Sequence, residues 1–315
     1  ITRLADHVAR TVEQLCDGYG RWHGHRLWRV DGSGVSMPDT PALQAHFGQP
    51  NVQPAGCGFP VASLVARMHA GTGMLLDMFI GPLVRHDMTA VPQMHERLQR
   101  GDVVLADRGF CSYAHLALLL QQGLHAVFRQ HQRKQVKFKD ERRRQGALPA
   151  KRRNGQPNDQ LVREINSDDQ VRRYFKCNSP KPKWMSQTQY DALPEQIEVR
   201  ELRYQVKRRG FRTRTVILVT TLTDEQTYPA QELTELYGDR WQIEVDLRSL
   251  KISLGMDVLH CKTVDGVLKE IWMFALVYNL VRLVMLQAAS RQGVPPDRIS
   301  FTDALRPLRQ FGLTD

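Results

Sequence analysis

The sequence predicts an α/β fold that carries a β-rich insertion, and three features of its hydrophobic pattern support this prediction. Short, continuous apolar runs at residues 27–30 and 103–106 are typical of strands that are covered on both faces. Helical periodicity alternates with such runs over the first 129 residues, which indicates helices layered on a sheet. Residues 130–215 show strand-like alternation in a basic context instead, which predicts a separate β-rich segment.

The first 24 residues are predicted to be the helical remnant of an N-terminal region. Apolar residues recur there at spacings of three to four, namely Leu4, Val8, Val12 and Leu15. The chain begins with Ile rather than Met, so we expect a further segment in front of it.

The first part of the core is predicted at residues 25–129, in a β-β-β-α-β-α-β order. Its predicted elements are strands at 27–30, 63–68 and 74–80, a helix at 87–100, a strand at 103–106, a helix at 113–122 and a strand at 126–128. The second and third strands flank Gly71-Thr72-Gly73, which predicts a hairpin. Gly101 directly follows the helix at 87–100, in a position where helices commonly end.

The predicted insertion at 130–215 contains the most basic stretch of the chain. Eleven of the 25 residues at positions 129–153 are Lys or Arg, and the densest runs are at 142–144 and 151–153. Residues 216–315 are predicted to complete the core and to add C-terminal helices. The strongest helical patterns there are at 229–253, where Pro229 suits a first helical position, and at 264–290.

The composition indicates a polyanionic partner. The net charge is +11 and the isoelectric point is near 9.6, and nucleic acid is the usual partner of such a protein. The five cysteines are scattered and odd in number, which argues against a disulfide framework or a zinc module and indicates a reducing compartment. The longest apolar stretch, at 271–281, is shorter than the ~20 residues that span a bilayer, so we expect a buried helix there and no membrane partner.

Two acidic residues directly follow the apolar runs of two predicted strands. Asp31 follows the run at 27–30, and Asp107 follows the run at 103–106. If these strands are adjacent, both carboxylates project from one edge of the sheet, and hard carboxylate oxygens suit Mg²⁺. The alternative is that each aspartate is a turn residue, because acids after strands are common in turns.

The helix predicted at 229–253 carries a polar stripe. At about 100° per residue, four side chains share one narrow face: Tyr237, Arg240, Glu244 and Lys251. A neighbouring apolar face can pack on the sheet and consists of Leu236, Ile243, Leu247 and Leu250. The stripe suits phosphodiester chemistry, because a carboxylate can hold metal while a phenol and two cations hold phosphates. The alternative is a solvated charged surface with a Glu244–Arg248 ion pair.

This set of residues resembles the signature of the IS4 family of bacterial insertion-sequence transposases. The polar stripe matches the family's Y-(2)-R-(3)-E-(6)-K pattern, with Tyr237, Arg240, Glu244 and Lys251. Asp31-Gly32-Ser33 resembles the family's first-acid motif, and Leu105-Ala106-Asp107-Arg108-Gly109-Phe110 resembles its second. The resemblance covers roughly residues 25–290.

The resemblance implies an RNase H-like catalytic core with a β-rich insertion before the last acidic residue. It implies that Asp31, Asp107 and Glu244 form the catalytic triad and hold two Mg²⁺ ions, for which Mn²⁺ can substitute. Tyr237, Arg240 and Lys251 would then contact DNA phosphates, and Arg248 lies close to the same face. Trp184 is a candidate for stacking on an unpaired base, and the alternative is that it lies in the core, as tryptophans more often do. Trp241 is predicted to lie in the core.

The resemblance also implies cut-and-paste DNA transposition, in which metal-dependent strand cleavage precedes strand transfer. The expected partners are double-stranded DNA, at the terminal inverted repeats and at the target, and a second copy of the chain in a synaptic homodimer. The expected location is the nucleoid in a bacterial cytoplasm. One departure concerns sequence-specific recognition, because the family usually carries a DNA-binding region before the first acid, and only about 30 residues precede Asp31 here.

Two other classes of protein remain open on sequence grounds. An RNase H-like nuclease that cuts without strand transfer would share the same three acids. A non-catalytic DNA-binding protein derived from a transposase would have no need to keep them, so the intact set argues against it.

Overall fold

The computed structural model describes residues 2–16, 18–50, 54, 56–83, 88, 94–132, 134, 136–140, 151, 154–206 and 214–311. The chain forms two compact units. Unit 1 consists of residues 1–94 and 241–315, and unit 2 consists of residues 95–240. The boundaries predicted after residues 24, 129 and 215 remain predictions.

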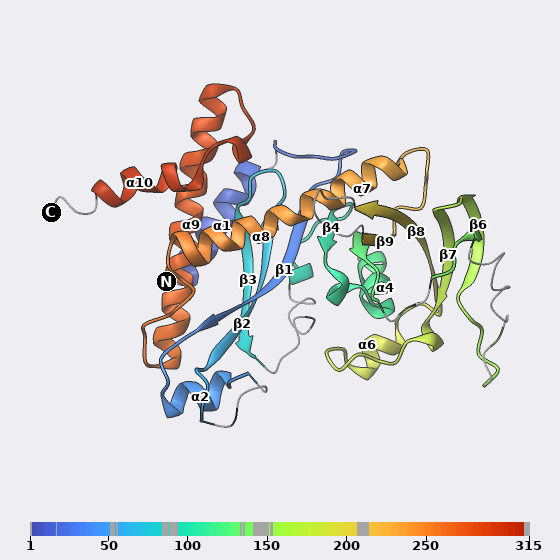
Figure 1. Ribbon diagram of the computed structural model, residues 1–315, viewed down its shortest axis with the longest axis horizontal. Coiled ribbons are helices and arrows are strands. Elements are labelled where there is room, and N and C mark those ends of the chain that lie inside the picture. The colour runs from blue at the N-terminus through green and yellow to red at the C-terminus, as the bar shows by residue number, and fades with distance from the viewer. Residues whose placement is uncertain are drawn as a thin grey trace. The chain divides into compact units, whose positions relative to one another are not determined.

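Unit 1 contains an antiparallel arrangement of strands in the order β3-β2-β1 (Figure 1). These strands are β1 (Leu27–Ser36), β2 (Val61–His69) and β3 (Leu75–Pro82). The hairpin predicted around Gly71-Thr72-Gly73 is confirmed, because the backbone N–H of His69 donates to Met74 O at 2.9 Å across that turn. The ladder between β1 and β2 continues to the pair Ser36 and Val61. For this reason β1 is longer than the predicted apolar run, and Asp31 lies within the strand rather than after it.

The helices of unit 1 come from both ends of the chain. They are α1 (Thr2–Cys16), α2 (Pro41–Phe47), α8 (Gln242–Arg248), a π-helical turn (Ser249–Ser253), α9 (Val264–Gln292), a 3₁₀ turn (Pro296–Arg298) and α10 (Phe301–Phe311). The helix predicted at 1–24 ends earlier, at Cys16. Gly20 follows with a positive φ of 61°, and a side chain there would meet Gly71 Cα at 2.5 Å, so this segment turns toward the β2–β3 hairpin instead of continuing as a helix.

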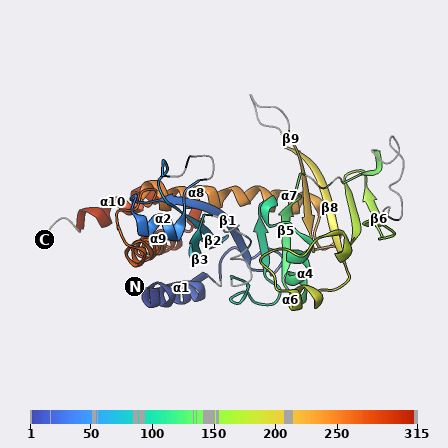
Figure 2. The same ribbon diagram turned by 90° about the horizontal axis from the view of Figure 1, so that it is seen from below.

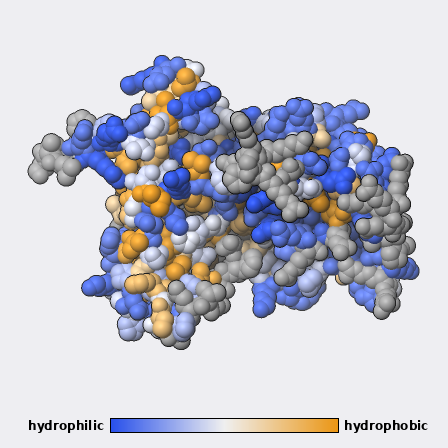
Figure 3. All heavy atoms as spheres, in the orientation of Figure 1, coloured by the Kyte–Doolittle hydropathy of each residue, from blue (hydrophilic) through white to orange (hydrophobic). Residues whose placement is uncertain are grey.

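Helix α9 is 29 residues long, and the helix predicted at 264–290 is thereby confirmed. Length and composition alone would allow it to cross a bilayer, but the core helix of a soluble protein meets the same criterion. One face of α9 is buried in unit 1, where α9 contacts α1 and β3 (Figure 2). Other apolar side chains of α9, such as Met273 and Leu280, reach the surface. Figure 3 shows apolar patches over the region of α9.

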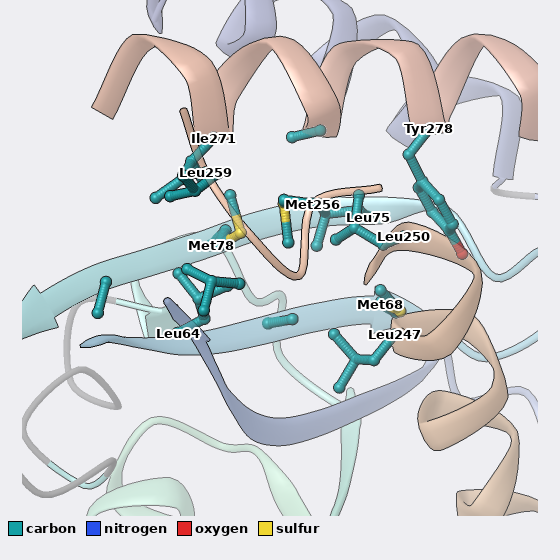
Figure 4. Close-up of a cluster of buried hydrophobic side chains, with 14 of the residues drawn as sticks. Leu64, Met68, Leu75, Met78, Leu247, Leu250, Met256, Leu259, Ile271 and Tyr278 are labelled. Carbon is teal, nitrogen blue, oxygen red and sulfur yellow. The ribbon is translucent and has the colours of Figure 1, made fainter. Parts of the chain in front are cut away.

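The core of unit 1 lies between the strands and the C-terminal helices (Figure 4). Met68 of β2 lies beside Leu247 of the helical segment, and Leu64 of β2 lies near Met78 of β3. Leu250 and, from α9, Ile271 belong to the same cluster. Each of these side chains is at most 6% exposed. Full burial of a leucine or methionine side chain contributes roughly 1.5–3 kcal/mol, so this cluster is the main force that holds α8 and α9 on the strands.

Unit 2 contains strands in the order β4-β5-β9-β8-β7-β6. They are β4 (Val103–Ala106), β5 (His125–Arg129), β6 (Gln160–Asn166), β7 (Asp169–Phe175), β8 (Gln196–Val206) and β9 (Arg214–Thr220). β4 and β5 are parallel, and every other described pair in this unit is antiparallel. All four residues of β4 are buried, as the continuous apolar run predicted.

The helical elements of unit 2 are short. They are a 3₁₀ turn (Arg108–Phe110), α4 (Tyr113–Gln121), a second 3₁₀ turn (Lys176–Asn178), α6 (Gln187–Asp191) and α7 (Ala230–Gly238), and a 3₁₀ turn at Asp239–Trp241 follows α7. α4 and α7 both contact β5 (Figure 2). Of the helix predicted at 87–100, the structure describes residues 88 and 94–100. Residues 94 and 95 are helical and 96–100 are turn and coil, so the predicted helix does not extend to Gly101.

The predicted fold class is confirmed. Strands and helices alternate along the chain as expected of an α/β protein, with the unpredicted helix α2 between β1 and β2, and strands dominate the described part of residues 130–215. The RNase H-like topology remains a prediction. The basic runs at 142–144 and 151–153 lie outside the described residues except for Lys151, which is exposed.

Candidate active site

Asp31 is held by a strand that is paired at this position. It lies opposite Ala66 of β2, and its Oδ1 accepts a hydrogen bond from the backbone N–H of Gly32 at 2.9 Å. The side chain is half-buried. The regular pairing on both sides of Asp31 fixes its backbone, so its carboxylate is presented from a rigid element rather than from a loop.

Glu244 lies on α8, which packs directly against β1. Ile243 and Leu250 are fully buried and Leu247 is 6% exposed, so the predicted packing face of this helix is confirmed. Glu244 itself is half-buried, while Arg248 is exposed. Unit 1 therefore contains two of the three predicted acids, on a strand and a helix that are in contact.

Lys251 connects the same helix to the same strand. Its Nζ donates to the backbone carbonyl of Gly34 at 2.7 Å and lies 3.3 Å from Ser33 Oγ. It belongs to the π-helical turn that follows α8, and such turns are frequent at functional sites. An ammonium has three N–H donors, so these two bonds leave one available.

Asp107 lies in unit 2, directly after the buried strand β4. Its Oδ1 accepts from the backbone N–H of Arg108 at 2.6 Å, and in this way it caps the following 3₁₀ turn. Phe110, at the end of that turn, is buried and anchors it. Asp107 is half-buried, like Asp31 and Glu244.

Tyr237 and Arg240 lie in the same unit as Asp107. Tyr237 is 8% exposed, and the Arg240 guanidinium carbon lies 5.8 Å from the centre of its ring. Burial raises the pKa of the Tyr237 hydroxyl above its ordinary value; Arg240 lowers it and the Asp107 carboxylate raises it further. The tyrosine therefore keeps its proton at neutral pH and can donate a hydrogen bond beside Asp107.

Two residues that the sequence reasoning missed belong to this group. Arg129, at the end of β5, and Tyr204, on β8, both act on the Tyr237 hydroxyl. Burial also raises the pKa of Tyr204, and Arg129 and Arg240 lower it. The parallel register of β4 and β5 pairs Ala106 with Phe128. The next residue in each case, Asp107 or Arg129, therefore lies at the same end of this strand pair. The sequence contains a signal for Arg129, because this arginine directly follows the apolar run at 126–128, which is the next predicted strand after Asp107.

The carboxylates have the chemistry that a hard divalent cation requires. All three predicted acids are half-buried and offer only oxygen ligands. The structure assigns Asp31 and Glu244 to unit 1 and Asp107 to unit 2. Among the residues that it describes, no group of three or more His, Cys, Asp or Glu side chains is gathered so that it could hold a metal ion.

The remaining predicted side chains differ in environment. Trp184 is half-buried and packs edge-on against His115, with ring centres 6.5 Å apart. The prediction that Trp241 lies in the core is wrong, because it is 60% exposed. Trp241 belongs to the 3₁₀ turn between α7 and α8. The nearest buried residues in the sequence are Tyr237 and Ile243, on the flanking helices.

The sequence matches a known protein family over most of its length. A family model described as "Transposase DDE domain" matches residues 22–280, which include every residue of the predicted triad and of the Y-(2)-R-(3)-E-(6)-K signature. The chain is also 26% identical, over 286 residues, to the transposase InsG for insertion sequence element IS4 of Escherichia coli (strain K12). That match covers 90% of this chain and 58% of the relative.

Among solved structures, the chain is similar to a piggyBac transposase in a synaptic complex with hairpin DNA, determined by cryo-EM. The TM-score is 0.47 and the sequence identity is 12%, and the match covers 90% of this chain and 51% of that one. The family match extends over most of the sequence, and the IS4 relative aligns with nearly all of it. The chain therefore belongs to the family of transposase DDE domains and is of the IS4 type.

Proposed function

We propose that this chain is the catalytic domain of a transposase that cleaves DNA at the ends of an insertion sequence and joins those ends to target DNA. The chain spans 58% of the length of the IS4 transposase that it resembles. Its own activity, substrate and partners are therefore part of this proposal.

One observation carries the proposal. The helix with Glu244 packs on the strand with Asp31, and Lys251 bonds the two elements together. Residues 213 positions apart in the sequence are thus brought to neighbouring rigid elements, and both are acids of the family motif. A solvated charged helix surface, the alternative considered from the sequence, would not require such an attachment.

We assign the metal ligands to Asp31, Asp107 and Glu244. Their half-buried carboxylates offer the oxygen donors that Mg²⁺ prefers, and Mn²⁺ accepts the same donors. If two such ions were bound by these carboxylates, they would supply activation of the attacking oxygen and stabilisation of the leaving oxygen of an in-line displacement.

Tyr237 and Arg240 are suited to hold the phosphate that is attacked. The Tyr237 hydroxyl is protonated and can donate to one phosphate oxygen, and the planar guanidinium of Arg240 can donate to two. Arg129 adds a second cation to this group. In unit 1, the remaining N–H of Lys251 can also contact a DNA phosphate.

The same side chains serve both reactions, because each reaction exchanges one phosphorus–oxygen bond for another. In cleavage, a water oxygen bonds to phosphorus while the bond to the 3′ oxygen breaks, which leaves a free 3′-hydroxyl. In joining, that hydroxyl attacks a target phosphate and the corresponding bond in the target strand breaks. The bond count is unchanged in the second step, so no external energy source is needed.

Double-stranded DNA is the partner that the charge of +11 favours. Within the proposal, the DNA includes the terminal inverted repeats and the target site. A second copy of this chain completes the synaptic complex, and the location is the nucleoid of a bacterial cytoplasm.

The test replaces each acid by its amide: Asp31→Asn, Asp107→Asn and Glu244→Gln. Each change should slow cleavage by roughly 10³-fold or more, about 4 kcal/mol, because a metal ligand is lost while side-chain volume is kept. The assay is single-turnover cleavage, with Mg²⁺, of the DNA that flanks this coding sequence in its own genome. Binding of the same DNA in Ca²⁺ should remain close to that of the unsubstituted chain.

Asp239→Asn is the matched control, since Asp239 is an exposed acid five positions before Glu244. It should cleave at the full rate. Normal cleavage by Glu244→Gln would show that the third ligand lies elsewhere, and cleavage without joined product would assign the chain to the nucleases of this fold.

A further inference from the structure

Helix α8, which carries Glu244, also contains one partner of a buried ion pair. Asp246, two residues after Glu244, is fully buried, and Arg282 of α9 is 5% exposed. The Arg282 Nη2 donates to Asp246 Oδ1, and Gln242 Nε2 donates to the same oxygen at 3.2 Å. Asp246 is therefore bonded to α9 through Oδ1, and its carboxylate is fully buried.

The pair continues into a chain of hydrogen bonds that ends on the β2–β3 turn. The Arg282 Nε donates to the hydroxyl of Tyr278 at 2.8 Å, and that hydroxyl donates to the carbonyl of Gly73 at 2.8 Å. Asn279 holds the same turn through both backbone groups of Leu75, at 2.9 and 2.7 Å. Any shift of α9 relative to the strands would break several of these bonds together.

The turn is shaped to receive the guanidinium. Gly73 has a positive φ of 67°, and a Cβ at this position would lie 2.8 Å from the guanidinium carbon of Arg282. Only glycine leaves this space open. The backbone of the β2–β3 turn, Arg282 and Asp246 thus form a close-packed series from the strands through α9 to α8.

The strand β1 contributes a second cation. Arg29 is 7% exposed, and its charge acts on the Asp246 carboxylate. Arg29 and Asp31 are two positions apart on β1, so they lie on the same face of the strand. Asp246 is therefore in electrostatic contact both with α9 and with the strand that carries Asp31.

We propose that Asp246 and Arg282 are positioning residues, whose ion pair fixes the rotation and height of α8 over β1 and thereby sets Glu244 relative to Asp31. This inference rests on the proposed function. Apolar contacts hold α8 down but are not directional. A buried ion pair is directional, because a small displacement of either partner leaves a charge that is neither hydrated nor paired. Such a pair adds little stability compared with apolar residues of similar size, so its value here is geometric.

The test separates positioning from stability by replacing the pair with apolar residues. Asp246→Leu alone should lower the urea midpoint of unfolding, because it leaves Arg282 buried without its partner. Adding Arg282→Met should restore most of that loss, while Tyr278 keeps its bond to Gly73. Single-turnover cleavage by the double variant should nevertheless remain about 100-fold below that of the unsubstituted chain, as expected for a shift of about 1 Å in a catalytic group.

A second measurement does not depend on activity. Hydrogen exchange of the backbone amides at residues 242–248 should be faster in the double variant, while amides in α9 stay protected. Asp246→Asn, which keeps an acceptor for Arg282 but removes the charge, provides a variant of nearly unchanged shape. It should show the same two effects at a smaller size, roughly tenfold in rate.

The matched control is the buried pair of Asp169 and Arg200 in unit 2. It is 2% and 1% exposed, with bonds of 2.8 and 2.5 Å, and neither residue belongs to the candidate active site. Asp169→Leu with Arg200→Met should leave the cleavage rate of the folded protein unchanged. If the Asp246 and Arg282 double variant behaves in the same way, with full cleavage and unchanged exchange in α8, the pair is only structural and the inference is wrong. An unsubstituted chain that cleaves no DNA would overturn the proposed function instead, and the exchange measurement would still decide whether the pair fixes α8.

Discussion

Replacing Arg240 by alanine is expected to slow the chemical step far more than it weakens DNA binding. Arg240 is half-buried, 5.8 Å from the ring of Tyr237, whose hydroxyl lies within the electrostatic influence of Asp107. A guanidinium in this position can follow the charge that develops on the attacked phosphate. Removal of one preorganised donor of this kind costs roughly 3 kcal/mol in the transition state, which is about a 10²-fold loss of rate.

Arg248→Ala is the matched control, because Arg248 is an exposed arginine on the helix that follows. An exposed charge contributes roughly 0.2–1 kcal/mol, so its loss should reduce the rate by about fivefold at most. Arg240→Lys should fall between the two, since it keeps the charge but lacks the planar pair of donors.

The assay is single-turnover cleavage with saturating DNA and Mg²⁺, with binding measured separately in Ca²⁺. Equal rate losses for Arg240→Ala and Arg248→Ala would refute the reasoning. The signature would then describe a charged helix surface, and the case for catalysis would rest on the three acids alone.

Three further predictions concern stability, and each is measured by urea unfolding. Burial lowers the pKa of His115 to about 4; the unfolded chain therefore binds a proton first as the pH falls, so stability should drop by roughly 3 kcal/mol between pH 6.5 and 4, and His115→Phe should remove this dependence. Gly73→Ala should cost roughly 1–2 kcal/mol for its positive φ plus the displacement of Arg282, and only the first part should remain in an Arg282→Met background. Lys251→Met should cost roughly 1.5 kcal/mol, because the bond to the Gly34 carbonyl is lost, and a change below about 0.3 kcal/mol would show that this bond does not hold α8 on β1.

The sequence contains most of the local structure because local structure follows short-range patterns. The apolar run before Asp107 predicts a buried strand, and β4 is buried throughout. The spacing of Ile243, Leu247 and Leu250 predicts the packed side of α8, and these residues are in the core. Both inferences need only the periodicity of a strand or a helix.

The same reasoning fails where the helix departs from regular geometry. Residues 230–253 pass from α-helix through a 3₁₀ turn to α-helix and then to a π-helical turn. A rotation of 100° per residue does not hold across these changes. Lys251, in the π-helical turn, bonds to the strand β1. Trp241 is exposed against expectation for another reason: the prediction used only the usual burial of tryptophan, whereas the helical period places Trp241 opposite the packed side of α8.

The sequence also does not reveal contacts between residues that are far apart along the chain. Asp246 reads as one more acid on a charged helix, because nothing near it in the sequence indicates that Arg282 will bury it. Likewise, Arg129 and Tyr204 join the Tyr237 group only because β5 and β8 belong to the same set of paired strands. Such contacts depend on the pairing of strands, which local periodicity does not contain.

The division of unit 1 into two stretches of chain has a consequence for synthesis on the ribosome. Strands β1, β2 and β3 are synthesised before unit 2, but α8 and α9, which cover their apolar residues, come after unit 2 in the sequence. At ~5–20 residues per second, these strands wait on the order of ten to forty seconds for their covering helices. Unit 2 is continuous in the chain and can complete its folding during that interval. A nascent chain thus carries Asp31 long before α8 can place Glu244 beside that strand.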